Sequence, residues 1–241
     1  MPPLSLQTAV VTGASSGIGA AIALCLAEEG ARLHLIGRNA AALEAVAKQA
    51  RKSSPSVLTY RADLSADADL AKLQTDLKRD CDGMDILVHS AGVIALGPLE
   101  SASLEDFDRQ YRTNARAPFA LTQALLPLLR THQGSVVFVN SSAGMNTRVS
   151  ISQYSATKHA LKAIADSFRA EVNSDGIRVL TVYPGRTASP QQAAIHQAEG
   201  KAYSPDLLMQ PADVARIIVD ALKVNRSAEV TDISIRPMRK T

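Results

Sequence analysis

A strand that runs into a glycine-rich turn and then into a helix is the feature that most constrains the fold of this chain. Residues 8–19 read Thr-Ala-Val-Val-Thr-Gly-Ala-Ser-Ser-Gly-Ile-Gly, and a helical pattern over 20–29 follows, with Gly30 as its predicted C-cap. Glycines in such a turn permit left-handed dihedrals, and the free amides and dipole of the helix N-terminus attract a pyrophosphate. The chain is therefore predicted to open with a phosphate-binding strand, turn and helix.

The glycine spacing is G-x-x-x-G-x-G, which is related to the dinucleotide fingerprint G-x-G-x-x-G without being identical to it. A loop whose glycines serve only helix packing is the alternative, and the order of strand, loop and helix argues against it. The residues of this turn that we expect to contact a dinucleotide are Gly13, Ser15, Ser16, Gly17, Ile18 and Gly19.

Apolar strands alternate with helical patterns along the rest of the chain. The predicted strands lie near residues 7–12, 32–36, 56–62, 85–89, 134–140, 177–183 and 229–235. Several are nearly continuous apolar runs, which suits strands buried on both faces of a parallel sheet. The 241 residues, 46% of them hydrophobic, can bury a full core, and no linker or repeat divides them. We predict one α/β domain over 1–241, a Rossmann-type doubly wound parallel sheet of about seven strands with helices on both faces.

Composition argues against several other classes of protein. The net charge of +3 is scattered, and four Phe, five Tyr and no Trp give little support to nucleic-acid binding. Cys25 and Cys81 form neither a C-x-x-C pair nor a metal-ligand cluster, so we expect buried thiols and no metal site. The N-terminus lacks a basic segment before a long apolar run, and no run of eighteen apolar residues occurs. We expect a soluble cytoplasmic protein without a membrane partner.

Tyr154 and Lys158 are four residues apart and would share one face of a helix. A free phenol ionises near ~10, and a nearby ammonium favours the phenolate, so this pair could exchange protons at neutral pH. The alternative is a surface tyrosine that packs beside a lysine stem, since this spacing often arises by chance.

Several short motifs together give the chain an end-to-end resemblance to the compact, one-domain short-chain dehydrogenases/reductases. They are Thr12-Gly13-Ala14-Ser15-Ser16-Gly17-Ile18-Gly19, Asp63-Leu64, Ala91-Gly92, Asn114, Ser141, Tyr154 with Lys158, and Pro184-Gly185. The resemblance implies an NAD(P)-dependent oxidoreductase that transfers hydride between the nicotinamide and a ketone, aldehyde or alcohol, with Asn114, Ser141, Tyr154 and Lys158 as its catalytic residues.

The family also implies a role for each catalytic residue. Ser141 and Tyr154 would hydrogen-bond the substrate oxygen, and Tyr154 would donate the proton during reduction. Lys158 would depress the tyrosine pKa and bind the nicotinamide ribose, while Asn114 would hold a water that leads protons to Lys158. Ser142 is adjacent to Ser141, but only Ser141 has the family spacing to Gly144 and Tyr154.

Further cofactor contacts are implied along the strand ends. They are Asp63, Leu64, Ser90, Ala91, Gly92, Tyr154, Lys158, Pro184, Gly185, Thr187 and Ser189. Three positions depart from the family pattern. His89-Ser90 replaces the usual pair of asparagines, with His89 expected to be structural, and Ser189 replaces a threonine that commonly contacts the nicotinamide carboxamide.

The end of the second predicted strand favours NADP(H) over NAD(H). An NAD site usually places a carboxylate there, whereas this chain has Gly37 followed by Arg38. Arg38 offers charge-assisted hydrogen bonds to a 2′-phosphate. In the competing interpretation, Arg38 is an exposed loop residue. Asn39 can cap the next helix in either interpretation.

The segment at about 190–210 is placed like the family's substrate lid, and its sequence names no substrate. Ile94, Leu96, Met145 and Leu208 are candidate apolar walls, and Arg148 is an ambiguous cation. Arg186 either attracts an acidic substrate or pairs with an acid on a loop, and the second is favoured.

Two long helices suggest how the chain would assemble. Ser103 is expected to cap a helix that runs to His132, with Pro118 and Pro127 kinking or dividing it. The family commonly associates through this helix, through the helix at 152–173 and through the last strand, which implies a homodimer or homotetramer. A non-catalytic cofactor-sensing regulatory or scaffold protein is the alternative function, and the complete catalytic set argues against it.

Overall fold

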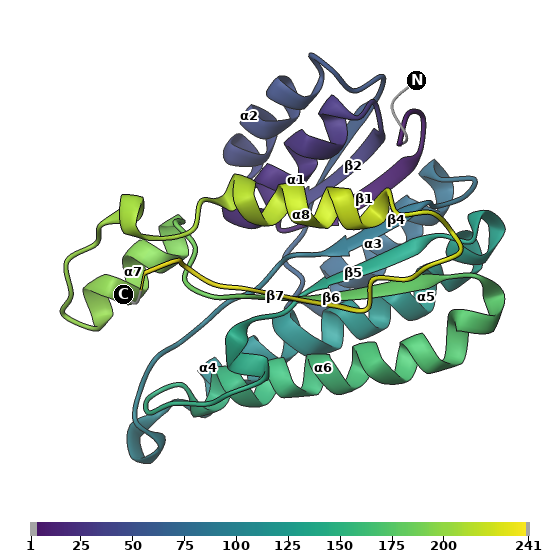
Figure 1. The fold of residues 1–241 in the computed structure, drawn as a ribbon. Coiled ribbons are helices and arrows are strands. Elements are labelled where there is room, and N and C mark those ends of the chain that lie inside the picture. Colours follow the sequence, from purple (N-terminus) through teal and green to yellow (C-terminus); the bar gives the residue numbers. More distant parts are fainter. Residues whose placement is uncertain (1–3, 240–241) are drawn as a thin grey trace.

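The computed structural model describes residues 4–239, so residues 1–3 and 240–241 of the predicted domain lie outside the described residues. Seven parallel strands form one sheet in the order β3-β2-β1-β4-β5-β6-β7, which confirms the predicted fold (Figure 1). Their bounds are Thr8–Thr12 (β1), Arg32–Gly37 (β2), Val57–Arg61 (β3), Ile86–His89 (β4), Ser135–Val139 (β5), Arg178–Pro184 (β6) and Asp232–Ile235 (β7).

Helices cover both faces of the sheet (Figure 1). Their bounds are Gly17–Glu28 (α1), Ala40–Ala50 (α2), Asp67–Asp80 (α3), Leu104–Tyr111 (α4), Ala117–His132 (α5), Ser152–Val172 (α6), Pro190–Ala198 (α7) and Pro211–Leu222 (α8). One core cluster joins α1, α2 and α8 to the sheet, and a second joins α3, α5 and α6 to the other face. Val10 and Val11 of β1 belong to opposite clusters, as expected for a central strand buried on both faces.

The last strand begins at Asp232, three residues later than the 229 predicted. Glu229 lies before it and accepts a hydrogen bond through Oε1 from the backbone amide of Val179, at 2.7 Å. A side chain therefore takes the position that a backbone carbonyl would occupy in a longer strand.

The helical stretch predicted from Ser103 to His132 is present, but its irregular point is a π-helical turn and neither proline divides it. Ser103 does cap α4, because its Oγ accepts from the amide of Asp106 at 3.3 Å. A π-helical turn over Arg112–Arg116 then separates α4 from α5. Pro118 lies in the first turn of α5, where a missing amide hydrogen costs little, and α5 continues through Pro127.

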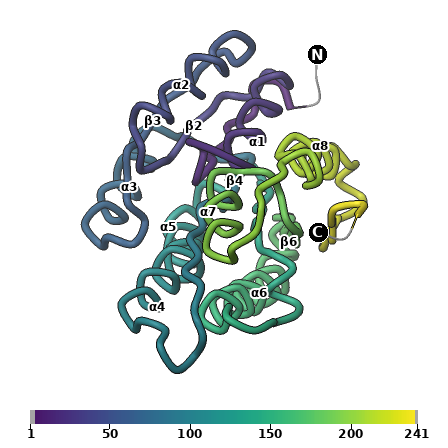
Figure 2. Tube along the Cα trace, turned by 90° about the vertical axis from the view of Figure 1, so that its left-hand side faces the viewer, coloured from purple at the N-terminus to yellow at the C-terminus, as the bar shows by residue number. Residues whose placement is uncertain are grey.

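The carboxyl ends of the strands form the edge of the sheet that carries the site. Strand order reverses between β1 and β4, and such a reversal opens a crevice at this edge. Figure 2 looks onto this side and shows α7 lying across its centre. Within residues 4–239, no helix combines the length and apolar character needed to span a bilayer.

Candidate active site

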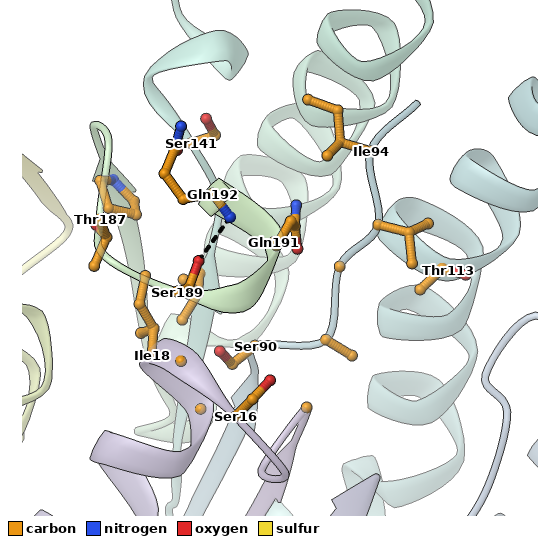
Figure 3. A pocket seen from close by; sticks show the side chains of 18 of the residues that line it. Ser16, Ile18, Ser90, Ile94, Thr113, Ser141, Thr187, Ser189, Gln191 and Gln192 are labelled. Carbon is orange, nitrogen blue, oxygen red and sulfur yellow. Dashed lines mark hydrogen bonds between the residues drawn. The ribbon is translucent and has the colours of Figure 1, made fainter. Parts of the chain in front are cut away.

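A cavity of about 370 Å³ lies at the carboxyl ends of the strands, between the glycine turn and α7. Every catalytic or cofactor-binding residue predicted from the sequence lines it except Asn114. Figure 3 shows the turn residues Ser16 and Ile18 on one side of this cavity and Ile94 and Thr113 on another. The fold thus brings together motifs that are far apart in the sequence.

The glycine turn is pressed against the end of β4. Gly13 has a φ of +69°, and a Cβ built there would lie 2.7 Å from the amide nitrogen of Ala91. Thr12 holds the two segments together, because its Oγ1 accepts from the amides of Ser90 at 3.0 Å and Ala91 at 3.2 Å. A side chain at position 13 would therefore separate the turn from the β4 loop.

The N-terminus of α1 faces the cavity with donors available. Ser16 is its N-cap residue, yet no side-chain cap bonds the first amides within the described residues. Gly17, Ile18 and Gly19 line the cavity at this point. Unbonded helix-start amides beside a glycine turn are the donor set that a pyrophosphate requires.

The end of β2 carries a cation and no carboxylate. Gly37 is packed so that a Cβ there would lie 3.1 Å from Cβ of Ser15. Arg38 is exposed and lines the cavity, and it takes part in no ion pair within residues 4–239. Asn39 caps α2, as predicted, since its Oδ1 accepts from the amide of Ala42 at 3.0 Å. The guanidinium of Arg38 fits the 2′-phosphate of NADP(H), because it can donate charge-assisted hydrogen bonds to a phosphate.

Tyr154 and Lys158 lie in the first two turns of α6 and line the cavity together with Ser141 at the end of β5. Nζ of Lys158 is 5.8 Å from the centre of the Tyr154 ring and donates to the carbonyl of Val139 at 3.2 Å. Oγ of Ser141 accepts from the amide of Ala143 at 3.1 Å.

The pKa values of this pair differ from the sequence-based expectation. Burial raises the pKa of Tyr154, and a hydrogen bond with Ser141 only partly opposes that effect. Burial also lowers the pKa of Lys158 to about 8. The predicted depression of the tyrosine pKa by Lys158 is therefore not found in the protein alone, because the low-dielectric surroundings disfavour both charged forms.

Asn114 lies behind the cavity wall, on the π-helical turn. It is fully buried and clamps Val93, accepting from its amide and donating to its carbonyl, each at 2.8 Å. A Cβ at Gly92 would lie 3.5 Å from Oδ1 of Asn114 and 3.8 Å from Nζ of Lys158. Asn114 therefore faces Lys158 across the narrow space that Gly92 leaves open.

His89 lies beneath the site and does not line the cavity. Its ring stacks on Phe138 with centroids 5.1 Å apart, and Nε2 is 2.8 Å from Oγ1 of Thr122. Burial lowers the pKa of His89 to about 3, so the ring is neutral at physiological pH. This environment agrees with the structural role expected for it, while Ser90 reaches the cavity.

Ser189 serves as the N-cap of α7. Its Oγ accepts from the amide of Gln192 at 3.1 Å (Figure 3). Its amide donates to the hydroxyl of Tyr203 at 3.1 Å. It also lies close to the glycine turn, because a Cβ at Gly17 would be 3.4 Å from that of Ser189. Ser189 thus connects the start of α7 with the start of α1.

The substrate end differs from the sequence-based expectation. Ile94 and Arg148 line the cavity, whereas Leu96, Met145 and Leu208 do not. Residues that the sequence analysis missed are Thr113, Asn140, Ala143, Ile151, Gln191, Gln192 and Ile195. Gln191 and Gln192 fall within the predicted lid segment, but the sequence does not show which of its side chains turn inward.

Comparison with known proteins now assigns the family. The family model for short chain dehydrogenases matches residues 7–200. The chain belongs to the short-chain dehydrogenase family. Among its relatives, an uncharacterised oxidoreductase of Staphylococcus aureus (strain USA300) is 31% identical over 239 residues, covering 99% of this chain and all of that protein. Glycine betaine reductase ATRR of Emericella nidulans is 33% identical over 240 residues. This match covers 98% of the chain and 19% of the much longer reductase.

Solved structures resemble this short-chain dehydrogenase closely. L-sorbose reductase from Gluconobacter frateurii, in complex with NADPH and L-sorbose, has a TM-score of 0.89 and 25% identity, with both chains fully covered. A metagenomic short-chain oxidoreductase in complex with NADP has a TM-score of 0.84 and 29% identity, covering 99% of this chain and 100% of that one.

As a member of this family, the protein is an oxidoreductase that acts on CH–OH or C=O groups of small molecules. The alternative of a non-catalytic cofactor sensor or scaffold is not favoured by these comparisons.

Proposed function

We propose that this enzyme is an NADP(H)-dependent reductase of a ketone or aldehyde, or the corresponding alcohol dehydrogenase in reverse. The observation that carries the proposal is the convergence of Ser141, Tyr154 and Lys158 on the cavity that also contains the glycine turn. A bound nicotinamide would supply or accept the hydride, which is the chemistry that no side chain of the protein provides.

The side chains align the substrate and move the proton. Ser141 and Tyr154 hold the carbonyl oxygen, and Tyr154 gives its proton to that oxygen during reduction. Lys158 would hold the nicotinamide ribose through its ammonium, and its positive charge would help Tyr154 release its proton. Asn114 holds a water next to Lys158 that returns a proton from solvent. Oxidation of an alcohol reverses these roles.

The remaining predicted residues bind the rest of the cofactor. The amides of 17–19 would hold the pyrophosphate, Arg38 would bind the 2′-phosphate, and Asp63 and Leu64 would contact the adenine. The nicotinamide half would be held by Ala91, Gly92, Pro184, Gly185, Thr187 and Ser189. NADP(H) is favoured because Gly37 offers no repelling carboxylate, and structural neighbours at 25% and 29% identity bind NADPH and NADP.

Turnover tests the proposed function directly. NADPH and NADH consumption is followed with a panel of ketones and aldehydes, using the wild type and Tyr154→Phe. Loss of the proton donor should lower reduction by at least about a hundredfold and leave NADPH affinity nearly unchanged. Tyr111→Phe removes the same hydroxyl from a half-exposed tyrosine outside the cavity and serves as the control. Activity of Tyr154→Phe within tenfold of the wild type would remove Tyr154 from the mechanism.

We also propose a homodimer or homotetramer. Leu104 and Phe119 are 77% and 51% exposed on α4 and α5, the helices through which the family commonly associates. Symmetric assembly would cover these apolar side chains. Light scattering at micromolar protein should therefore show a multiple of the 25.5 kDa chain. A species of ~25 kDa alone would overturn this proposal.

A further inference from the structure

Four charged side chains meet where α7 ends, and we call them the Glu199 cluster. Nη2 of Arg186 donates to both oxygens of Glu199, at 2.7 and 2.9 Å. Nη1 of Arg148 donates to Oε1 of Glu199 at 3.0 Å, and Nζ of Lys201 lies 3.2 Å from Oε2. Arg148 and Arg186 also line the cavity. The cluster thus joins the loop after β5, the loop after β6 and the predicted lid.

Positive charge exceeds negative charge in the Glu199 cluster, because three cations share one carboxylate. Partial burial opposes ionisation of Glu199, but hydrogen bonds from Arg186, Arg148 and Lys201 outweigh it and lower the pKa of Glu199 to about 2. His196 adds no negative charge; its Nε2 lies 3.3 Å from Nη1 of Arg186. The mouth of the cavity is therefore electropositive.

Arg148 is the cation of the cluster that can be shared with a ligand. The side chain of Arg186 is 19% exposed and bonds both oxygens of Glu199, whereas that of Arg148 is 50% exposed and bonds one. Glu199 would keep Arg186 and Lys201 if Arg148 turned towards the cavity. Within the described residues, the remaining guanidinium nitrogens of Arg148 have no hydrogen-bond partner.

Among the described residues, the other side chains at the substrate end carry no charge. Its walls are apolar at Ile94, Ile151 and Ile195, and neutral at Gln191 and Gln192. In the part of the chain that the structure describes, Asp63 is the one carboxylate among the lining residues. It follows β3, near Arg38, at the end assigned to adenine.

Two of the four cations that line the cavity already have proposed roles. Arg38 is assigned to the 2′-phosphate and Lys158 to the ribose and Tyr154. Arg186 is held by Glu199 and His196. Arg148 is left as the accessible cation on the substrate side.

We propose that the substrate carries an anionic group, a carboxylate or a phosphate, remote from its reactive carbonyl, and that Arg148 binds this group. The inference rests on the proposed reductase function and names the class of substrate. Arginine suits the task because its planar fork forms charge-assisted hydrogen bonds with either anion. If Arg148 serves only to hold the lid through Glu199, its loss will affect charged and neutral substrates alike.

Matched pairs of substrates test this inference. Acetoacetate, levulinate and 5-oxohexanoate are compared with their methyl esters, and dihydroxyacetone phosphate with dihydroxyacetone, using the wild type, Arg148→Gln and Arg51→Gln. Arg51 is the control, because its side chain is 43% exposed, pairs with Glu44 and lies outside the cavity. The acid set varies the spacing of carbonyl and carboxylate, and the phosphate pair distinguishes the two anions.

In the wild type, at least one anion should be reduced with a kcat/KM about tenfold or more above that of its neutral partner. Arg148→Gln should remove most of this preference, because it should lower kcat/KM for the anion about tenfold more than for its neutral partner, and Arg51→Gln should retain the preference. The preference should also weaken in high salt, because Arg148 is half exposed.

Three results would overturn the inference. One is wild-type reduction of neutral carbonyls at rates equal to or above those of every anion. Another is an anion preference that Arg148→Gln leaves intact, and a third is an equal loss for both members of each pair. Each of these leaves the reductase function standing, whereas the absence of NADPH oxidation with any carbonyl removes both proposals.

Discussion

Helices α1 and α7 both begin beside the cavity, yet different forces hold them. Helix α1 buries Ile22 and Leu26 completely, against the sheet and α8. Helix α7 buries only Gln192 and His196 within the described residues, and polar contacts including the Glu199 cluster hold it. Burial of apolar side chains fixes α1 on the cofactor side of the cavity, since exposing that apolar surface to water is costly. Polar contacts can be exchanged for water at small net cost, which suits a lid that opens.

Hydrogen exchange should reveal the largest difference between the two helices. The amides in the middle of α1 should exchange only through global unfolding, whereas those of α7 should exchange through local opening. We expect protection factors at least about a thousandfold lower in α7, measured by mass spectrometry on the protein without cofactor. Equal protection of the two helices would show that α7 is part of the rigid core and not a lid.

Lys158 lines the cavity and is proposed to serve both the ribose and Tyr154, so its loss should affect both cofactor binding and chemistry. Lys158→Ala should lower turnover by at least about a hundredfold and also weaken NADPH binding. Lys162→Ala is the matched control, because Lys162 lies one turn further along α6 and pairs with Asp166 at the surface. Loss of turnover with unchanged NADPH affinity, from stopped-flow and fluorescence titration, would contradict the ribose contact.

The preference for NADPH over NADH is expected to depend only on residues of the cofactor side, at the end of β2. NADPH should bind roughly ten- to a hundredfold more tightly than NADH, since charged hydrogen bonds typically contribute ~1.5–3 kcal/mol. Gly37→Asp combined with Arg38→Ser should reverse the preference, because it adds repulsion and removes attraction. KM for the carbonyl substrate should change little. Equal or tighter binding of NADH by the wild type would make Arg38 only a loop residue.

The pH dependence should report the buried ammonium. Burial lowers the pKa of Lys158 to about 8, so the charge required for the ribose and Tyr154 is present below that pH and lost above it. The pH dependence of kcat/KM for NADPH reports ionisations of the free enzyme. This value should therefore fall about tenfold between its plateau at lower pH and pH 9. A profile that stays flat to pH 10 would show that Lys158 remains charged.

Two helix caps should give the smallest effects and still separate the regions. Asn39→Ala removes the cap of α2, a helix that contributes Leu43 and Ala47 to the core, and should lower the free energy of unfolding by ~1 kcal/mol. Ser189→Ala removes the cap of α7. It should change global stability less, because we expect α7 to open without global unfolding. It should instead weaken NADPH binding severalfold. Urea unfolding and cofactor titration distinguish these outcomes, and the reverse pattern would contradict the comparison.

Local features were predictable because they depend on neighbours in the sequence. The strand order along the chain, the caps at Asn39 and Ser103, and the turn at Gly13 follow from side-chain and backbone chemistry over a few residues. The meeting of Ser141, Tyr154 and Lys158 at one cavity also followed from the motifs, once the parallel sheet was inferred.

Other features depended on contacts between distant segments. The π-helical turn at Arg112–Arg116 accompanies the clamp of Asn114 on Val93, a contact that lies 21 residues away in the sequence. The direction in which the pKa of Tyr154 shifts depends on how deeply the fold buries its side chain. The four-residue spacing between Tyr154 and Lys158 carries no information about that burial.

The Glu199 cluster shows the same division most clearly. The sequence alone determined the α/β fold and predicted a dinucleotide turn, and its family resemblance implied a catalytic set, because each is written in short and ordered patterns. Only the tertiary structure decided that Arg148 and Arg186 share Glu199 beside the substrate end of the cavity. Pairing of charges 51 and 13 residues apart depends on where three separate loops are brought together, and no local pattern in the sequence specifies that.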